Sequence, residues 1–239
     1  MWIVAATILL GGGYVSCLLL ELPEVEHLAR ENPTATALME VRGGERTQVW
    51  VPLAEISPRL LKAVLMGEDA GFYGHNGFDT HEMKEAFRRN WEEGRTVRGA
   101  STITQQLAKN LYLSSDRTYT RKVKEAILTY RLEEALSKSR ILEIYLNVIE
   151  WGDGVYGVEA GAREVFGKPA MELDAAEAAT LAAMIPNPRE LDPCEQAESV
   201  RVRRDRILHW MHGADDLTYE ELKRALNTNP RLRKCRSPA

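Results

Sequence analysis

Residues 98–110 read RGASTITQQLAKN, a run of hydroxyl and amide side chains that closes on a lysine and an asparagine. From Ser101 to Gln106 only Ile103 interrupts the polar residues, which is unusual for a helix packed in a core. Backbone N–H groups at a helix start, together with hydroxyls and a lysine, can hold phosphate or sugar oxygens. The run therefore predicts a helix whose first turns line a binding cleft. A polar cap on a solvated helix is the alternative.

Upstream of this run, the stretch GEDAGFYGHNGFD (67–79) places two adjacent carboxylates, Glu68 and Asp69, at the end of an apolar helix. A carboxylate beside apolar surface has its pKa raised by desolvation, which suits it to take a proton near neutral pH. Taken alone, this pair is more simply explained as an acidic helix end in solvent.

Downstream, Arg117 and the segment RKVKE (121–125) put four cations within about two helical turns of one glutamate, Glu125. Arg121 and Glu125 are neighbours at the i,i+4 spacing. This pattern alone is also typical of a helix salt bridge with flanking solvated lysines.

The three stretches together suggest two separated carboxylates with a basic patch between them. Paired carboxylates are typical of chemistry at an anomeric carbon. A hydrolase needs water and a protonated leaving oxygen, whereas a patch of lysine and arginine stabilises a leaving group that departs negative, such as a diphosphate. With an apolar amino terminus, this combination indicates a lipid-linked sugar diphosphate as the substrate.

The charge distribution agrees with a local anionic ligand. The chain has 239 residues with 35 acidic and 31 basic side chains, and its net charge of −4 argues against a nucleic-acid partner. Residues 1–20 carry no charge, whereas residues 84–125 hold ten basic and five acidic side chains. A basic stretch in an acidic protein favours one anionic site over a polyanion track.

Residues 1–20, MWIVAATILLGGGYVSCLLL, are long and apolar enough to cross a bilayer as a helix. A cleaved signal peptide is less favoured because no basic segment precedes the run. We predict a transmembrane anchor at 1–20 and a connector at 21–35, with the body outside the cytoplasm because no lysine or arginine immediately follows the span. Cys194 and Cys235 form a disulfide or remain two free thiols; the sequence leaves both open.

Residues 36–53 are predicted to form two short strands, TALMEVR and RTQVWVPL, joined at Gly43-Gly44. The rest is mostly helical and ends in a basic helix at 195–211. Helix starts are indicated at Ser57-Pro58, at Asp79 with Glu82, and at Asp174 with Glu177. Because there is no repeat and no second linker, residues 36–239 are predicted to be one mainly α-helical domain.

Five runs, in this order, resemble glycosyltransferase family 51, the peptidoglycan glycosyltransferase domain also found at the front of bifunctional penicillin-binding proteins. The resemblance covers roughly residues 36–211. Because no transpeptidase domain follows, we expect a monofunctional member with one amino-terminal anchor. The runs are EDAGFYGHNGFD (68–79), GASTITQQLAKN (99–110), RKVKE (121–125), KSRILEIYLNVIEWG (138–152) and LDAAEAATLAAMIPNPRELDP (173–193).

The resemblance implies a mainly α, lysozyme-like glycosyltransferase domain with a small β-hairpin, preceded by one transmembrane helix. It implies a place on the periplasmic side of the bacterial inner membrane. The implied activity is polymerisation of lipid II into peptidoglycan strands by inverting transfer, which forms a β-1,4 linkage and releases polyprenyl diphosphate. Glu68 would be the base that takes the proton of the acceptor sugar's 4-hydroxyl, and Glu125 would lie beside the diphosphate of the growing chain.

Further roles follow from the same resemblance. The diphosphate would be contacted by Lys109, Arg117 and Lys124, and the basic patch would be shaped by Arg121 and Lys122. The cleft would be lined by Ser101, Thr102, Gln105, Gln106 and Asn110. Motif residues that are expected to hold the fold are Asp69, Phe72, His75, Gly77, Glu143, Tyr145 and Asn147.

The expected partners are lipid II, the growing glycan chain, the lipid bilayer and cell-wall synthases, and no nucleic acid. No ligand spacing predicts a metal site, although a divalent cation, Mg²⁺ or Mn²⁺, at the diphosphate is compatible with the chemistry. The family has a membrane-touching segment between its first two motifs, and Phe87 and Trp91, with Arg88 and Arg89, match it. One stripe facing the core is the alternative for the two aromatic residues.

Two other functions stay open at this stage. A glycan-cleaving muramidase of lysozyme-like fold would share the carboxylates, but it has no need of the basic cluster. A non-catalytic, membrane-tethered scaffold for the cell-wall machinery would need neither the carboxylates nor the basic cluster.

Overall fold

The computed structural model describes residues 22–94, 99–113, 118–233 and 235. The predicted anchor at 1–20 lies outside these residues. Within the described parts of the chain, no helix has both the length and the apolar character to cross a bilayer.

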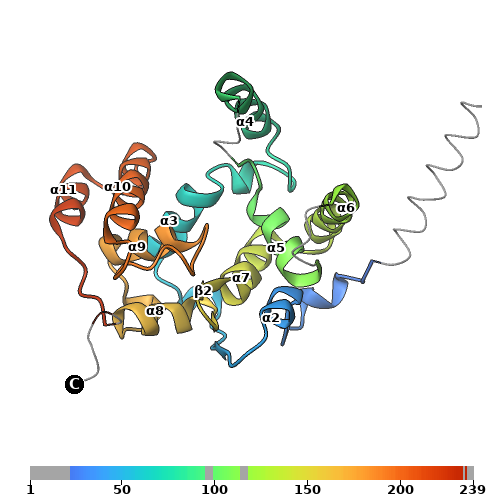
Figure 1. Ribbon diagram of the computed structural model, residues 1–239, viewed down its shortest axis with the longest axis horizontal. Coiled ribbons are helices and arrows are strands. Elements are labelled where there is room, and N and C mark those ends of the chain that lie inside the picture. The colour runs from blue at the N-terminus through green and yellow to red at the C-terminus, as the bar shows by residue number, and fades with distance from the viewer. Residues whose placement is uncertain (1–21, 95–98, 114–117, 234, 236–239) are drawn as a thin grey trace, which may run out of the picture.

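The described chain is mainly helical, with one small sheet, as predicted from its sequence (Figure 1). The α-helices are α2 (Ala37–Arg42), α3 (Pro58–Glu68), α4 (Thr80–Glu93), α5 (Ile103–Tyr112), α6 (Tyr119–Ala135), α7 (Lys138–Val148), α8 (Val158–Phe166), α9 (Ala175–Met184), α10 (Ala197–Gly213) and α11 (Tyr219–Asn227). Short 3₁₀ helices are η1 (Glu26–Ala29), η2 (Leu53–Glu55), η3 (Phe72–Gly74) and η4 (Ala170–Glu172). The strands are β1 (Thr47–Gln48), β2 (Glu150–Gly152) and β3 (Val155–Tyr156).

Helix α9 is the buried centre of one half of the molecule and packs against both α3 and α10. Every residue from Ala176 to Met184 is buried, which the alanine-rich sequence permits because small side chains allow neighbouring helices to approach closely. The predicted capping box is confirmed: Asp174 and Glu177 each accept a hydrogen bond from the other's backbone N–H. Helix α3, which ends at Glu68, therefore packs against a buried helix.

In the other half, α5 packs against α6 and α7 (Figure 1). The segment expected to be a connector contributes to this half from Leu22 onward, because Val25 and Leu28 are fully buried. Two arginines secure its backbone: Arg131 donates to the carbonyl of Leu22, and Arg140 donates to that of Leu28.

Of the two strands predicted within residues 36–53, the first is wrong. Residues 37–42 form helix α2, because the Thr36 hydroxyl accepts a hydrogen bond from the N–H of Met39 and caps the helix. The second half supplies β1, which pairs in parallel with β3, while β2 and β3 form the antiparallel hairpin. A small hairpin is therefore present, but it lies at residues 150–156.

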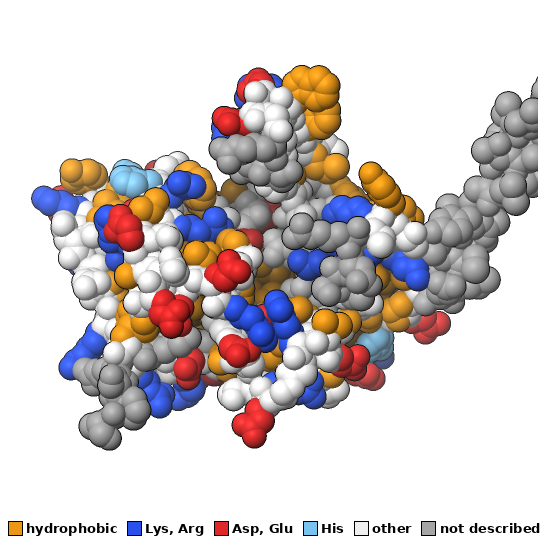
Figure 2. Space-filling view, viewed as in Figure 1, with side chains coloured by type: hydrophobic (Ala, Val, Ile, Leu, Met, Phe, Trp, Pro, Cys, Tyr) orange, Lys and Arg blue, Asp and Glu red, His pale blue; other side chains and the backbone are white. Residues whose placement is uncertain are grey.

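Helix α4 projects from the rest of the domain (Figure 1), and Ala86 is the residue it buries. Phe87 and Trp91 are 68% and 79% exposed, and their stacked rings lie 6.1 Å apart. The interpretation of these two residues as a core-facing stripe is therefore wrong. Hydrophobic side chains stand out at the tip of α4 in Figure 2.

The carboxyl-terminal region adds a helix and a cross-link that the sequence did not settle. Helix α11 follows α10, which begins and ends two residues later than predicted. Cys194 and Cys235 form a disulfide, so the first of the two alternatives for these thiols is correct. The N–H of Arg233 donates to the carbonyl of Val165, which ties the final segment to α8.

Candidate active site

Glu68 is the last residue of α3, and its side chain is 9% exposed. Burial raises the pKa of its carboxyl, an effect that a hydrogen bond from Gln106 and the charge of Arg203 oppose and that nearby Asp69 reinforces. The carboxylate thus combines the desolvation expected of a base with two donors that fix its oxygens in space.

A chain of side chains orients one of those oxygens. The hydroxyl of Tyr145, buried in α7, donates to Oε1 of Gln106 at 2.9 Å. Nε2 of Gln106 then donates to Oε2 of Glu68 at 3.0 Å. Because the amide oxygen is engaged by Tyr145, the amide nitrogen has to face the carboxylate. Tyr145, expected to hold the fold, therefore also positions Glu68.

Arg203 in α10 engages the other oxygen and was missed by the sequence reasoning. Its Nη2 donates to Oε1 of Glu68 at 2.9 Å and to the carbonyl of Gly67 at 3.3 Å. The basic helix was recognised in the sequence. What the sequence lacked was a motif that distinguishes Arg203 from the other arginines of that helix.

The second carboxylate, Glu125, is buried in α6 and ion-paired with two cations of the same helix. Arg121 donates to its Oε2 at 2.9 Å, and Lys122 donates to its Oε1. The i,i+4 pairing is as predicted. Lys109 on α5 interacts electrostatically with both carboxylates, and partial burial between the cleft walls lowers the pKa of its ammonium group.

Two cavities meet at the first carboxylate. The larger, about 1350 Å³, lies between the end of α3, the inner side of α4 and one face of α10. The smaller, about 600 Å³, extends past Lys109, Asn110 and Arg121 toward α2 and the loop after α9. Four residues line both cavities: Glu68, Ser101, Gln106 and Pro186. The carboxylate therefore lies where the two cavities meet, and the smaller cavity has Lys109 and Arg121 in its wall.

Not all predicted site residues face this cleft. Thr102 lines the larger cavity, but Gln105 does not line either cavity, because its side chain closes a capping box on Thr102 at the start of α5. The expectation that Gln105 lines the cleft is therefore corrected. Lys124 lies in α6 among the described residues, whereas Arg117 lies outside them.

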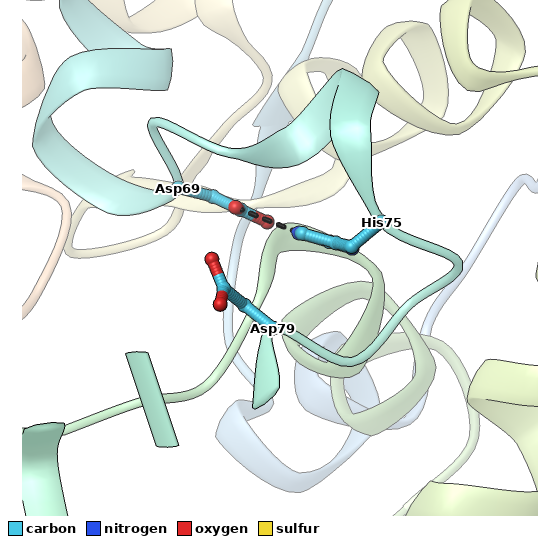
Figure 3. Close-up of side chains that lie close together, drawn as sticks. All are labelled: Asp69, His75 and Asp79. Carbon is cyan, nitrogen blue, oxygen red and sulfur yellow. Dashed lines mark hydrogen bonds and ion pairs between the residues drawn. The ribbon is translucent and has the colours of Figure 1, made fainter. Parts of the chain in front are cut away.

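Asp69, His75 and Asp79 gather at the turn between α3 and α4 (Figure 3), with ligand-type atoms within 4.8 Å of one another. The N–H of Gly77 donates to Nδ1 of His75, so the ring proton is on Nε2, which donates to Asp69 at 2.9 Å. The other oxygen of Asp69 accepts from the N–H of Ile103 at 2.9 Å. With these atoms engaged, the group fits a hydrogen-bonded turn and does not fit a metal site.

The remaining motif residues hold elements together. Phe72 is fully buried, and the backbone of Gly77 has a φ of 83° and packs so closely on α6 that a Cβ would lie 2.6 Å from a methyl group of Thr129. On α7, Glu143 accepts from the N–H of Leu53, and Asn147 both accepts from and donates to the backbone of Val51. These contacts place β1 and the turn after α3 relative to the cleft.

A mainly helical domain with a desolvated carboxylate facing a cationic cleft wall fits the class of glycan-processing enzymes that use paired carboxylates. The transglycosylase family matches residues 34–212, and the chain belongs to that family. It is 47% identical over 193 residues to the biosynthetic peptidoglycan transglycosylase of Methylobacillus flagellatus, covering 77% of this chain and 82% of that one.

A second relative has the same name. The biosynthetic peptidoglycan transglycosylase of Laribacter hongkongensis is 49% identical over 170 residues, which cover 67% of this chain and 75% of the relative. Among solved structures, the chain is similar to penicillin-binding protein 1A of Haemophilus influenzae, with a TM-score of 0.47 and 24% identity. That match covers 80% of this chain and 19% of the other.

Proposed function

We propose that this chain is a peptidoglycan glycosyltransferase that polymerises lipid II into glycan strands during bacterial cell-wall synthesis. The observation that carries the proposal is the pair of cavities that meet at Glu68, because a transferase has to hold two sugar substrates at one reacting centre. The smaller cavity, with Lys109 and Arg121 in its wall, suits the diphosphate of the growing chain. A muramidase, which activates water, has no need of that cationic wall.

In the proposed reaction Glu68 takes the proton of the acceptor's 4-hydroxyl. The freed oxygen forms a bond to C1 of the growing chain as the bond from C1 to the diphosphate oxygen breaks. Attack from the side opposite the diphosphate inverts the anomeric centre and gives a β-1,4 linkage. The raised pKa of Glu68 brings its proton affinity closer to what a base needs near neutral pH.

The departing polyprenyl diphosphate carries its negative charge toward α5 and α6. In the proposal this charge is neutralised by Lys109 and Lys124, together with Arg117, while Glu125 holds Arg121 and Lys122 in position beside it. No step requires a metal. A divalent cation, Mg²⁺ or Mn²⁺, at the diphosphate stays a prediction that chelation with EDTA and re-addition of each ion would test.

The proposed setting is the periplasmic face of the inner membrane, with residues 1–20 as a single anchor. The exposed pair Phe87 and Trp91 on α4, flanked by Arg88 and Arg89, supports a second contact with the bilayer, because aromatic rings and basic side chains favour the membrane interface. Cell-wall synthases stay expected partners.

The experiment is polymerisation of fluorescent lipid II by the purified full-length protein, with Glu68→Gln as the test variant and Glu220→Gln as the control. Glu220 is exposed on α11, away from both cavities. We expect long glycan strands from the wild type and the control, and none from Glu68→Gln. Soluble fragments released from cell-wall sacculi would instead favour a muramidase, and no turnover of either substrate would favour a scaffold.

A further inference from the structure

One face of α10 is left open to solvent and borders the larger cavity. Val202, Arg206, His209, Trp210 and Gly213 recur at helical spacing and are all exposed. All of them except Val202 line the cavity. In Figure 2, hydrophobic, histidine and basic side chains lie together at the upper edge of the α10–α11 side.

This face runs away from Glu68 along one wall of the larger cavity. Arg203 contacts Glu68 at the inner end. At 1.5 Å of rise per residue, Arg206 lies about 4.5 Å from Arg203 along the helix axis, and Trp210 lies about 10 Å from Arg203. A ligand that approaches Glu68 along this row therefore passes the aromatic ring of Trp210 first and the cation of Arg206 second.

Arg206 makes no ion pair with the described residues, in contrast to Arg201 on the same helix, which pairs with Glu198 and Asp205. The facing wall on α4 supplies Arg89 and three glutamates. One of these, Glu92, is ion-paired with Arg88. The other two, Glu82 and Glu93, have interactions of their own. The charge of Arg206 is thus available to an anion within the cavity.

The second substrate of the proposed reaction has matching chemistry. Resting on the proposed function, the acceptor lipid II presents its 4-hydroxyl to Glu68, and its own diphosphate and polyprenyl chain lie further out. We propose that Arg206 and His209 bind the diphosphate of the acceptor and that Trp210 contacts the start of its polyprenyl chain. Arginine pairs with phosphate oxygens in a bidentate manner, and tryptophan suits a border between polar and apolar groups.

The test measures initial polymerisation rates of the full-length protein against lipid II concentration in non-ionic detergent micelles. The variants are Arg206→Gln, Arg206→Lys and the matched control Arg201→Gln, each with its melting temperature checked. We expect the KM for lipid II to rise about tenfold or more for Arg206→Gln with little change in kcat, because a hydrogen bond to a charged group is lost. Arg206→Lys should recover part of the loss.

Three outcomes distinguish the explanations. Equal KM values for Arg206→Gln and Arg201→Gln would overturn the inference. An effect confined to vesicles that contain phosphatidylglycerol would assign Arg206 to bilayer lipids and would also overturn the inference, because in the micelles lipid II is the anionic lipid that Arg206 can meet. Absence of polymerisation by the wild type in either medium would refute the proposed function itself, independently of Arg206.

Discussion

Replacing Arg203 with glutamine tests whether Glu68 sets the pH dependence of the reaction. In the wild type, burial raises the pKa of Glu68, while Arg203 and Gln106 oppose that rise. Glutamine removes the positive charge and the 2.9 Å hydrogen bond. The pKa of Glu68 then rises further, the carboxyl stays protonated to higher pH, and the base form is lost earlier as pH falls. The acid limb of the pH–rate profile should therefore move to higher pH.

The size of the effect follows from the contact. A hydrogen bond between charged groups contributes about 1.5–3 kcal/mol, and the lower end applies because the Arg203 side chain is 28% exposed and solvent screens the pair. The rate on the acid limb should fall about tenfold. At alkaline pH Glu68 is ionised in both proteins, and the difference should shrink.

Initial rates of lipid II polymerisation, measured from mildly acidic to mildly alkaline pH, give the profile. Arg201→Gln, which removes the same charge from an exposed position of the same helix, is the control and should leave the profile unchanged. An acid limb that coincides with the wild type, or that moves to lower pH, would refute Glu68 as the group whose ionisation limits the reaction.

Three further predictions concern positioning and stability. Tyr145→Phe removes the donor that orients Gln106, and the rate should fall about two- to tenfold in the polymerisation assay. Gly77→Ala forces a side chain onto a left-handed backbone in contact with α6, and thermal unfolding should show a loss of about 1–3 kcal/mol. Replacing both Cys194 and Cys235 with serine removes a cross-link between residues 41 apart, and unfolding should show a loss of about 4 kcal/mol.

Each of these predictions has a matched control. Tyr130→Phe removes an exposed hydroxyl and should keep full activity, so an equal loss in both tyrosine variants would contradict the positioning role. Gly74→Ala adds a Cβ that meets nothing within 4 Å, and a penalty equal to that of Gly77→Ala would argue against the steric reason. Dithiothreitol should lower the melting temperature of the wild type and leave the double serine variant unaffected; a wild type insensitive to reduction would contradict the predicted cross-link effect.

The sequence was sufficient to predict the fold where a short segment determines its own structure. The start of α9 was predictable because Asp174 and Glu177 satisfy each other's backbone within four residues. The helix at residues 37–42 was not predictable, because a pattern of six residues fits a strand and a helix equally well. Their structure depends on the cap supplied by Thr36. Further along the chain, the position of Val51 depends on Asn147, which lies 96 residues later and accepts a hydrogen bond from the N–H of Val51.

In the candidate site, too, local features were predictable and contacts between distant segments were not, as Arg203 shows. The helix that bears it was predicted, and its buried positions Val200, Ile207, Leu208 and Met211 follow from helical periodicity. Those positions place Arg203 at the border of the packed face, where a cation reaches whatever the neighbouring helix presents. That this is Glu68, 135 residues earlier, depends on α10 packing against both α3 and α9. Glu68 lies within a recognisable motif, but the contacts that shift the pKa of its carboxyl are assembled by tertiary packing.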